Sequence, residues 1–194
     1  YKNLTFSLFL KPSFLPLADQ WLLNMTIAVA LADSITDILY ESSANVKIKW
    51  PNDIYVDDRK VCGILVTNQV RGNYLCQSIC GIGLNVNQTT FPDWVPNPTS
   101  LSLASGMEYE LKPLLDVILE RITSYYNQLK TKPASIKPLY MSHLYRLGQK
   151  ARYIRDGVMI VATITDVDRY GHLHLTTDED DELVCDLKEV SFVI

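Results

Sequence analysis

The stretch that decides the fold reads KWPND at residues 49–53, IYVDD at 54–58 and RKVCGILV at 59–66. Residues 46–50 form a short run with strand character, and Pro51 ends it because proline cannot donate a backbone hydrogen bond. Apolar runs on either side of the turn at Asp57-Asp58 are typical of a β-hairpin. The stretch therefore predicts a short strand followed by a hairpin, and it carries the densest polar cluster in the chain.

That cluster contains two lysines, Lys49 and Lys60, on either side of Asn52 and Asp53. Residues on paired strands approach to roughly 5 Å, so we expect Asn52 and Lys60 to meet across the hairpin. An ammonium, an amide and a carboxylate around one point could neutralise carboxylate and phosphate oxygens and read a base edge. Gly63 would let a ligand lie against the strand backbone. The alternative, from the residues alone, is a surface hairpin with solvated charges.

The segments before and after this stretch predict an α+β arrangement. Residues 3–11 alternate apolar and polar side chains as a half-buried strand does. Apolar residues recur every three or four positions over residues 18–40, a helical period. Further on, the patterns predict a strand over 74–87, a short helix capped by Thr99 or Ser100, and helices over 111–130 and 134–144. The expected larger unit is a mixed, mostly antiparallel sheet packed with helices.

The chain changes character after Gly148. Five short strands are predicted over 151–154, 158–165, 172–176, 183–187 and 191–194, with turns at Asp156-Gly157 and Tyr170-Gly171. So many short strands in under fifty residues fit a small SH3-like barrel. We therefore expect two domains, residues 1–145 and residues 146–194.

Composition excludes several classes of protein. With 18 Lys+Arg against 22 Asp+Glu the net charge is −4, which excludes bulk electrostatic binding of nucleic acid. The sequence contains no uncharged apolar run of about 18 residues, so we expect no membrane span and a cytoplasmic protein. The four cysteines lack metal-ligand spacing and are expected to be small buried apolar residues, so no metal site is predicted: Cys62, Cys76, Cys80 and Cys185.

Three linked motifs resemble the catalytic domain of biotin–protein ligases. They are KWPND at 49–53, the K-x-x-G-I-L strand at 60–65 and the G-x-G-x-N strand at 81–85, in the order and spacing of that family. NLTFSL at 3–8 and NPTSL at 97–101 are also similar to family segments. The resemblance extends to the tail, where ITDVD at 164–168, GHL at 171–173 and KEVSF at 188–192 resemble the family's C-terminal SH3-like domain.

The resemblance implies a class II synthetase-like catalytic domain and a reaction in two steps. Biotin is activated with ATP to biotinyl-5′-AMP, and a lysine of a biotin carboxyl carrier domain then takes the biotin and releases AMP. Biotin and ATP are substrates, with Mg²⁺ expected beside the nucleotide phosphates. Lys60 matches the catalytic lysine at the biotin carboxylate and α-phosphate. Gly63, Gly81 and Gly83 match biotin-binding positions, and Lys49, Asn52, Asp53 and Asn85 match nucleotide-binding positions.

The sequence departs from the family in two places. The family's Gly/Arg-rich loop, which covers biotin and the phosphates, does not occur in these 194 residues, and Tyr1 begins where it should end. We therefore expect a truncated chain, or a protein that has lost that half, and a weak or inactive one as it stands. Thr67 replaces a residue that is commonly acidic in the family. A lipoate ligase or octanoyltransferase relative, or a binding or scaffold fragment without turnover, are the alternatives.

Other features have simpler interpretations. Trp50 is expected in the core. His172 and His174 share one face of a strand and are expected to serve packing or the surface rather than a metal. The acidic run at residues 178–182 is expected to be a solvated turn. An exposed sheet edge could support a homodimer.

Overall fold

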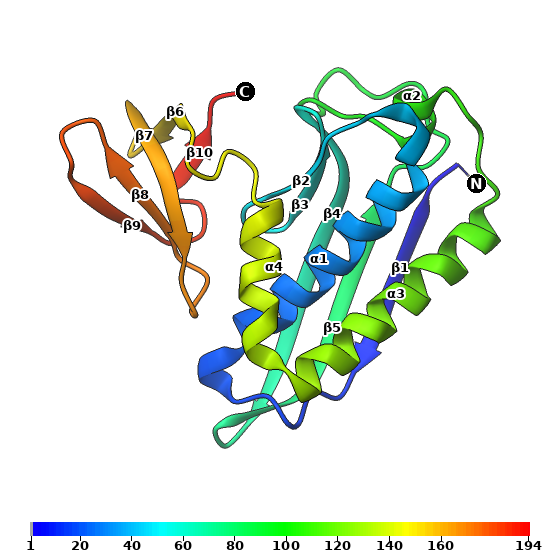
Figure 1. Cartoon of the computed structure of the whole chain (residues 1–194), viewed down its shortest axis with the longest axis horizontal. Helices are drawn as coiled ribbons and strands as arrows, with labels where there is room; N and C mark the ends of the chain where they lie inside the picture. Colours follow the sequence, from blue (N-terminus) through cyan, green and yellow to red (C-terminus); the bar gives the residue numbers. More distant parts are fainter. Residues whose placement is uncertain (1) are drawn as a thin grey trace.

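The computed structural model describes residues 2–194 and contains two five-stranded antiparallel sheets (Figure 1). The first sheet has the strand order β1-β5-β4-β3-β2. Its strands are β1 (Leu4–Leu10), β2 (Val46–Lys49), β3 (Asp53–Val56), β4 (Arg59–Arg71) and β5 (Tyr74–Leu84). Tyr1, on which the expectation of a truncated chain rests, lies outside the described residues.

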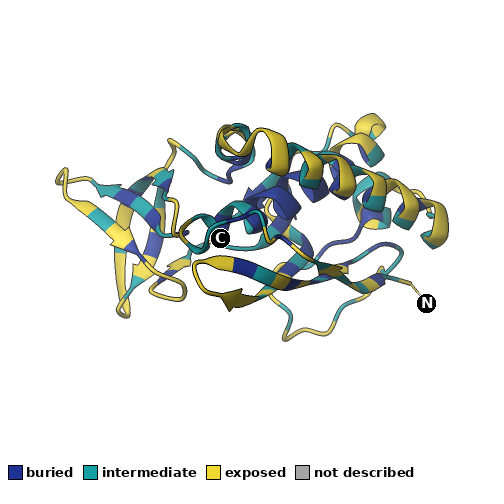
Figure 2. Cartoon of the chain, turned by 90° about the horizontal axis from the view of Figure 1, so that it is seen from below, coloured by how far each residue is buried: buried dark blue, intermediate teal, exposed yellow. Residues whose placement is uncertain are grey.

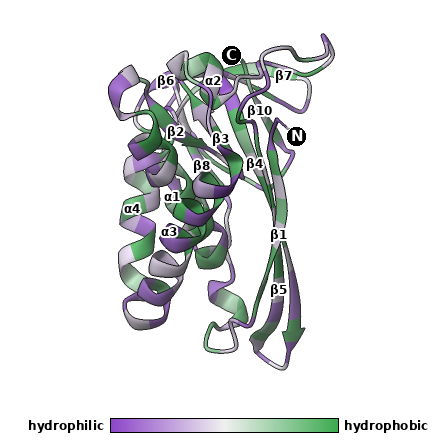
Figure 3. Cartoon of the chain, turned by 90° about the vertical axis from the view of Figure 1, so that its right-hand side faces the viewer, coloured by the Kyte–Doolittle hydropathy of each residue, from purple (hydrophilic) through white to green (hydrophobic). Residues whose placement is uncertain are grey.

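Helices cover one face of the first sheet, while the other face stays open (Figures 1 and 3). The α-helices are α1 (Trp21–Ile38), α2 (Leu101–Ser105), α3 (Leu111–Thr131) and α4 (Ile136–His143), with 3-10 turns at Leu17–Asp19, Tyr40–Ser42 and Pro133–Ser135. Strand β1 shows the two faces, because Leu4 is buried toward the helices whereas Thr5, Ser7 and Phe9 are exposed. This alternation is the half-buried pattern predicted from the sequence.

Helix α1 is the core helix of the first sheet. Twelve of its residues are buried, among them Leu23, Ile27 and Leu31. By length and composition the segment Leu17–Ile38 could cross a membrane, but 67% of the tested window is buried inside the protein. Burial against a sheet accounts for its apolar character, as Figure 2 shows for the inner sides of the helices.

The second sheet is built by the last five strands, in the order β10-β6-β7-β8-β9. They are β6 (Lys150–Arg155), β7 (Val158–Val167), β8 (Leu173–Thr177), β9 (Glu182–Cys185) and β10 (Val190–Phe192). Five short antiparallel strands agree with the expected SH3-like fold. The link between the sheets runs through residues 144–149, close to the boundary expected near residue 146, and the division into two domains stays a prediction.

The two sheets are joined through glycine and tryptophan. The carbonyl of Gly171 accepts a hydrogen bond of 2.8 Å from Nε1 of the buried Trp50, so the core position expected for Trp50 is confirmed. Gly171 has φ +95°, and a Cβ there would lie 2.4 Å from the ring of Trp21 on α1. Only glycine fits this position, because both the backbone conformation and the Trp21 ring exclude a side chain.

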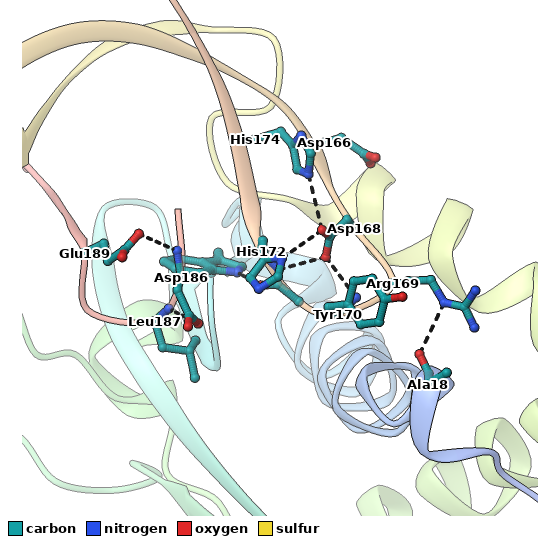
Figure 4. A network of polar contacts seen from close by, with 12 residues as sticks. Ala18, Asp166, Asp168, Arg169, Tyr170, His172, His174, Asp186, Leu187 and Glu189 are labelled. Atoms are coloured by element: carbon teal, nitrogen blue, oxygen red, sulfur yellow. Dashed lines mark hydrogen bonds and ion pairs between the residues drawn. The ribbon is translucent and has the colours of Figure 1, made fainter. Parts of the chain in front are cut away.

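A carboxylate organises the turn that carries Gly171 (Figure 4). Asp168 accepts hydrogen bonds from the backbone amides of Tyr170 and His172, at 2.8 and 3.0 Å, and from Nδ1 of His172, at 2.9 Å. Nε2 of His174 lies 3.5 Å from the same carboxylate. Burial acts to raise the pKa of Asp168, but these hydrogen bonds outweigh it and lower the pKa to about 2. The two histidines thus share one face, as predicted, and face Asp168.

The predicted elements correspond closely to those found. Ser100 is the N-cap of α2 and accepts a hydrogen bond of 3.2 Å from the amide of Leu103. The acidic run at residues 178–182 is exposed, as expected of a solvated turn. Three of the four cysteines are buried, whereas Cys76 is only partly so. Within residues 2–194 no group of three or more His, Cys, Asp or Glu side chains is placed to hold a metal ion.

Candidate active site

The KWPND segment is the turn between β2 and β3, and it brings Lys49 opposite Asp53 in the strand register. Asn52 does not lie opposite Lys60 in the hairpin, because Tyr55 is the residue paired with Lys60, so that expectation is wrong. The Asn52 side-chain amide instead donates to the carbonyl of Ile64 at 2.6 Å, and the Asn52 carbonyl accepts from the Ile64 amide at 2.9 Å. This pair of bonds locks the turn onto β4. The partner of the Lys60 ammonium is Asp53, at 2.6 Å.

An extra residue in β4 explains this arrangement. Ile54 pairs with Cys62 but the next residue, Tyr55, pairs with Lys60, so β4 contains one residue more than β3 and forms a β-bulge at Val61. Regular alternation would place Lys60 on the same face as Cys62, which is buried under the helices. The bulge reverses the direction in which the Lys60 side chain points, so that it lies on the open face of the sheet. Lys60 therefore reaches Asp53 instead of the core.

Because Gly63 has no side chain, it leaves room for the Lys60 side chain to pass over the strand toward Asp53. A Cβ at Gly63 would lie 3.3 Å from both Cε and Nζ of Lys60 and 3.6 Å from Oδ1 of Asp53. The Lys60 side chain is 40% exposed and that of Asp53 is 17% exposed. An ion pair at this exposure contributes only about 0–1 kcal/mol to stability. The main consequence of the ion pair is to hold the Lys60 ammonium at one place on the open face of the sheet. From there the ammonium can still contact an anionic ligand.

Glycines form the floor beside that ammonium. The register places Thr5, Gly83, Gly63, Asp53 and Lys49 in one row across all five strands, and Ser7, Gly81 and Leu65 in the next row. Apart from Lys49, the residues of these rows line a cavity of about 310 Å³, which we call the glycine trough, with Lys60 and Asn52 at its side. A Cβ at Gly83 would meet nothing within 4 Å, and one at Gly81 would make only ordinary contacts. Neither glycine has a positive φ, so the fold itself does not require them.

A second cavity adjoins the trough, and we call it the loop cavity. It measures about 330 Å³ and lies between the strands and the proline-rich loop, lined by Val61, Cys62, Asn85, Val95, Pro96 and Pro98 together with Lys60, Gly63 and Gly83. The loop is fixed to the sheet, because the amide of Lys60 donates to the carbonyl of Asn97 at 2.7 Å and the Asn85 side-chain amide donates to that of Thr99 at 2.9 Å. Lys60, Gly63 and Gly83 line both cavities, so the ammonium stands where the two meet.

Lys49 lies apart from this point, in a cleft between the two sheets. The cleft measures about 700 Å³, and Asn52, Tyr55, Lys188 and Phe192 are among the residues that line it with Lys49. Burial lowers the pKa of Lys49, while the nearby Asp53 carboxylate acts in the opposite direction. Asn52 lines both this cleft and the trough. The three hollows are therefore neighbours on one side of the molecule.

The structure thus brings together most of the residues singled out from the sequence. Lys60, Asp53, Gly63, Gly81 and Gly83 surround one space, with Asn52 at its side, while Asn85 lines the adjoining loop cavity and Lys49 lines the cleft. Their individual ligand contacts stay predictions. Sequence reasoning missed Thr5 and Ser7 of β1. Their alternation indicated an open face, but only the pairing with β5 could reveal that they lie beside the glycines.

Comparison with known proteins relates this chain to a family of ligases. Residues 1–85 match the model of the Biotin/lipoate A/B protein ligase family. The chain is similar to that family of ligases over these residues, which include all five strands of the helix-covered antiparallel sheet. Its curated relatives include a bifunctional ligase/repressor and biotin–protein ligases. It is 33% identical over 179 residues to the bifunctional ligase/repressor BirA of Bacillus spizizenii, an alignment that covers 89% of this chain and 53% of that protein.

Two further comparisons extend this result. The chain is 25% identical over 155 residues to the biotin–[acetyl-CoA-carboxylase] ligase of Mycobacterium tuberculosis, covering 79% of this chain and 56% of that protein. The fold superposes with a TM-score of 0.77 on the biotin protein ligase of Aquifex aeolicus solved with biotin and ATP, at 24% identity, covering 99% of this chain and 78% of the other. The chain spans about half the length of the curated relatives it matches.

Proposed function

We propose that this chain carries the catalytic centre of a biotin–protein ligase. It activates biotin with ATP to biotinyl-5′-AMP and transfers the biotin to a lysine of a biotin carboxyl carrier domain. The observation that carries the proposal is the position of Lys60, whose ammonium stands where the glycine trough and the loop cavity meet. A reaction that joins two anions is favoured by a fixed cation placed between their two binding sites. Here the Lys60 ammonium lies between two adjoining cavities.

In the first step a carboxylate oxygen of biotin attacks the α-phosphorus of ATP. A carboxylate–phosphorus bond forms, the bond to the bridging oxygen breaks, and pyrophosphate leaves with its electron pair. Lys60 neutralises the carboxylate and the α-phosphate together, which reduces their repulsion and stabilises the charge that develops between them. In the second step the amine of the acceptor lysine attacks the biotinyl carbonyl, loses a proton and displaces AMP.

The two substrates divide the site between them. Biotin lies in the glycine trough over Gly63, Gly81 and Gly83, where the bare backbone leaves room for its rings. The nucleotide lies toward the loop cavity, with Asn52 and Asn85 near its base and Asp53 and Lys49 near its phosphates. Mg²⁺ would be held mainly by the nucleotide phosphates and would neutralise part of their charge. Because Asp53 already pairs with Lys60, its carboxylate serves to orient that ammonium as well.

The acceptor and the location follow from the same proposal. The printed name of the Mycobacterium tuberculosis relative, a biotin–[acetyl-CoA-carboxylase] ligase, supports a carboxylase carrier domain as acceptor. A cytoplasmic location and a homodimer through an exposed sheet edge are further parts of the proposal.

The direct test is Lys60→Ala in the full-length protein, with biotin-dependent release of pyrophosphate from ATP as the readout. Removing a group that stabilises transition-state charge costs about 10²–10³-fold in rate, so we expect a loss of that size. Lys137→Ala is the matched control, since Lys137 has a similar exposure, 38%, and a 2.7 Å ion pair with Asp166 outside the site. A wild-type rate of adenylate formation in Lys60→Ala would reject the assignment.

Two outcomes would favour the alternatives. Calorimetry with biotin and with lipoate distinguishes the acyl substrate, and tight binding of lipoate without biotin would identify a lipoate ligase or octanoyltransferase relative. Biotin binding with no pyrophosphate release from the wild-type protein would instead indicate a binding or scaffold module.

A further inference from the structure

The ammonium of Lys49 lies against two aromatic rings that come from different sheets. Its Nζ is 4.5 Å from the ring centroid of Phe192 on β10 and 5.4 Å from that of Tyr55 on β3. Both distances fall within the range of about 6 Å over which a ring face attracts a cation. Asp53, directly opposite Lys49 in the register, forms its ion pair with Lys60 instead. The two rings therefore hold the Lys49 ammonium in place of a carboxylate.

Phe192 is itself firmly placed by the second sheet. It pairs with Tyr153 in the β10–β6 ladder, and the two rings meet edge to face with centroids 5.1 Å apart. Tyr153 is fully buried, so it gives Phe192 a rigid support. The ring of Tyr145 lies 6.3 Å away on another side. The second sheet thus sets the position of the Phe192 ring, although the ring contacts Lys49, which belongs to the first sheet.

Lys49 and Phe192 both line the cleft between the sheets, with Asn52 and Lys188. Lys49 is half-buried, so its ammonium has lost part of its hydration, and this burial lowers its pKa. A partly desolvated cation interacts more strongly with an incoming anion than a hydrated one does. The site therefore presents a cation that is held in place and ready to bind phosphate oxygens.

We propose that Phe192 is a positioning residue: its ring holds the Lys49 ammonium for the phosphates of the nucleotide. The second sheet thereby contributes to nucleotide affinity through this one side chain. The inference rests on the proposed function, in which Lys49 binds the nucleotide.

The test compares Phe192→Leu, which keeps apolar bulk but removes the ring face, with Phe192→Tyr, which keeps the ring. In the full-length protein we expect Phe192→Leu to raise the KM for ATP by about 2- to 30-fold, the range that one cation–π contact provides, with kcat unchanged. Phe192→Tyr should restore the wild-type KM. A fall in kcat with an unchanged KM, or no rescue by tyrosine, would show that Phe192 only packs.

A double-mutant cycle asks whether Phe192 acts through Lys49. If it does, Phe192→Leu has no further effect on the KM for ATP in a Lys49→Met background. Independent, additive effects would overturn the inference while leaving the proposed function intact. If the wild-type protein has no affinity for ATP at all, the proposed function fails and the inference fails with it.

The chain supplies a matched control in its helix layer. Nζ of Lys130 lies 4.7 Å from the ring centroid of Tyr126 and 5.8 Å from that of Phe14, away from the cavities described here. Phe14→Leu therefore removes a ring from a similar lysine and should leave the KM for ATP unchanged. NMR gives a readout that does not depend on activity, since the ring current should shift the Lys49 ε-protons upfield. That shift should disappear in Phe192→Leu and persist in Phe192→Tyr, and its absence in the wild type would overturn the proposal.

Discussion

Alanine at Gly83 should make the protein more stable and at the same time weaken its binding of biotin. Gly83 lies on β5 at the floor of the trough, with a φ that other residues can adopt and with nothing within 4 Å of an added Cβ. Replacing such a glycine removes conformational entropy from the unfolded chain and stabilises by about 0.4–1 kcal/mol. For a chain of this length that corresponds to a rise in Tm of about 1–4 °C.

The effect on the ligand has the opposite sign. The new methyl group would occupy space that, in the proposed function, belongs to biotin. An extra methyl in a close-packed site costs about 1–3 kcal/mol, which weakens binding by about 5- to 150-fold. Differential scanning calorimetry measures the first effect and titration calorimetry with biotin the second, both on the full-length protein.

The matched control is Gly157→Ala, in the turn between β6 and β7. Its Cβ would also meet nothing within 4 Å, but Gly157 has φ +78°. Alanine there should cost about 1–2 kcal/mol of stability and leave the affinity for biotin unchanged. If Gly83→Ala bound biotin as tightly as the wild type, the trough would not be the biotin site. A fall in Tm for Gly83→Ala would show that the fold, and not a ligand, requires this glycine.

Two further predictions concern the junction of the sheets. The pKa of Asp168 is lowered from 3.8 to about 2, so its hydrogen bonds stabilise the protein above about pH 4, and this contribution is lost as the pH falls toward 2. We therefore expect the free energy of unfolding of Asp168→Asn to be lower than that of the wild type by roughly 1–3 kcal/mol near neutral pH. Unfolding measured over a series of pH values should show this difference shrinking between pH 4 and pH 2. Gly171→Ala should destabilise more than Gly157→Ala by about 1–3 kcal/mol, measured by urea unfolding, because only at Gly171 does the new Cβ overlap the Trp21 ring.

Each of these predictions has a clear contrary result. A stability difference for Asp168→Asn that stayed constant from neutral pH to pH 2 would mean that the charge of Asp168 is not what stabilises the turn. Equal losses for Gly171→Ala and Gly157→Ala would mean that the turn moves away from Trp21 at no cost.

Much of the local structure could be read from the chain because local patterns report local forces. The alternation in β1, the helical period of α1 and the hydroxyl that caps α2 each depend on residues a few positions apart. The motifs also indicated that Asp53, Lys60 and the glycines belong together, and in the structure these residues line one cavity. Their resemblance to a family supplied the roles, which the residue pattern alone left open between a binding site and a solvated hairpin.

The sequence by itself therefore determined the elements, their order and the identity of the polar residues. The tertiary structure decided which of them meet. The bulge at Val61 turns Lys60 from the helix-covered face to the open face, and a single extra residue in a strand pairing has no local signature. The register between β4 and β5 assembles the glycine floor from Gly63, Gly81 and Gly83. Phe192 reaches Lys49 only because two sheets pack together, since contacts between residues so far apart in the chain depend on the whole fold.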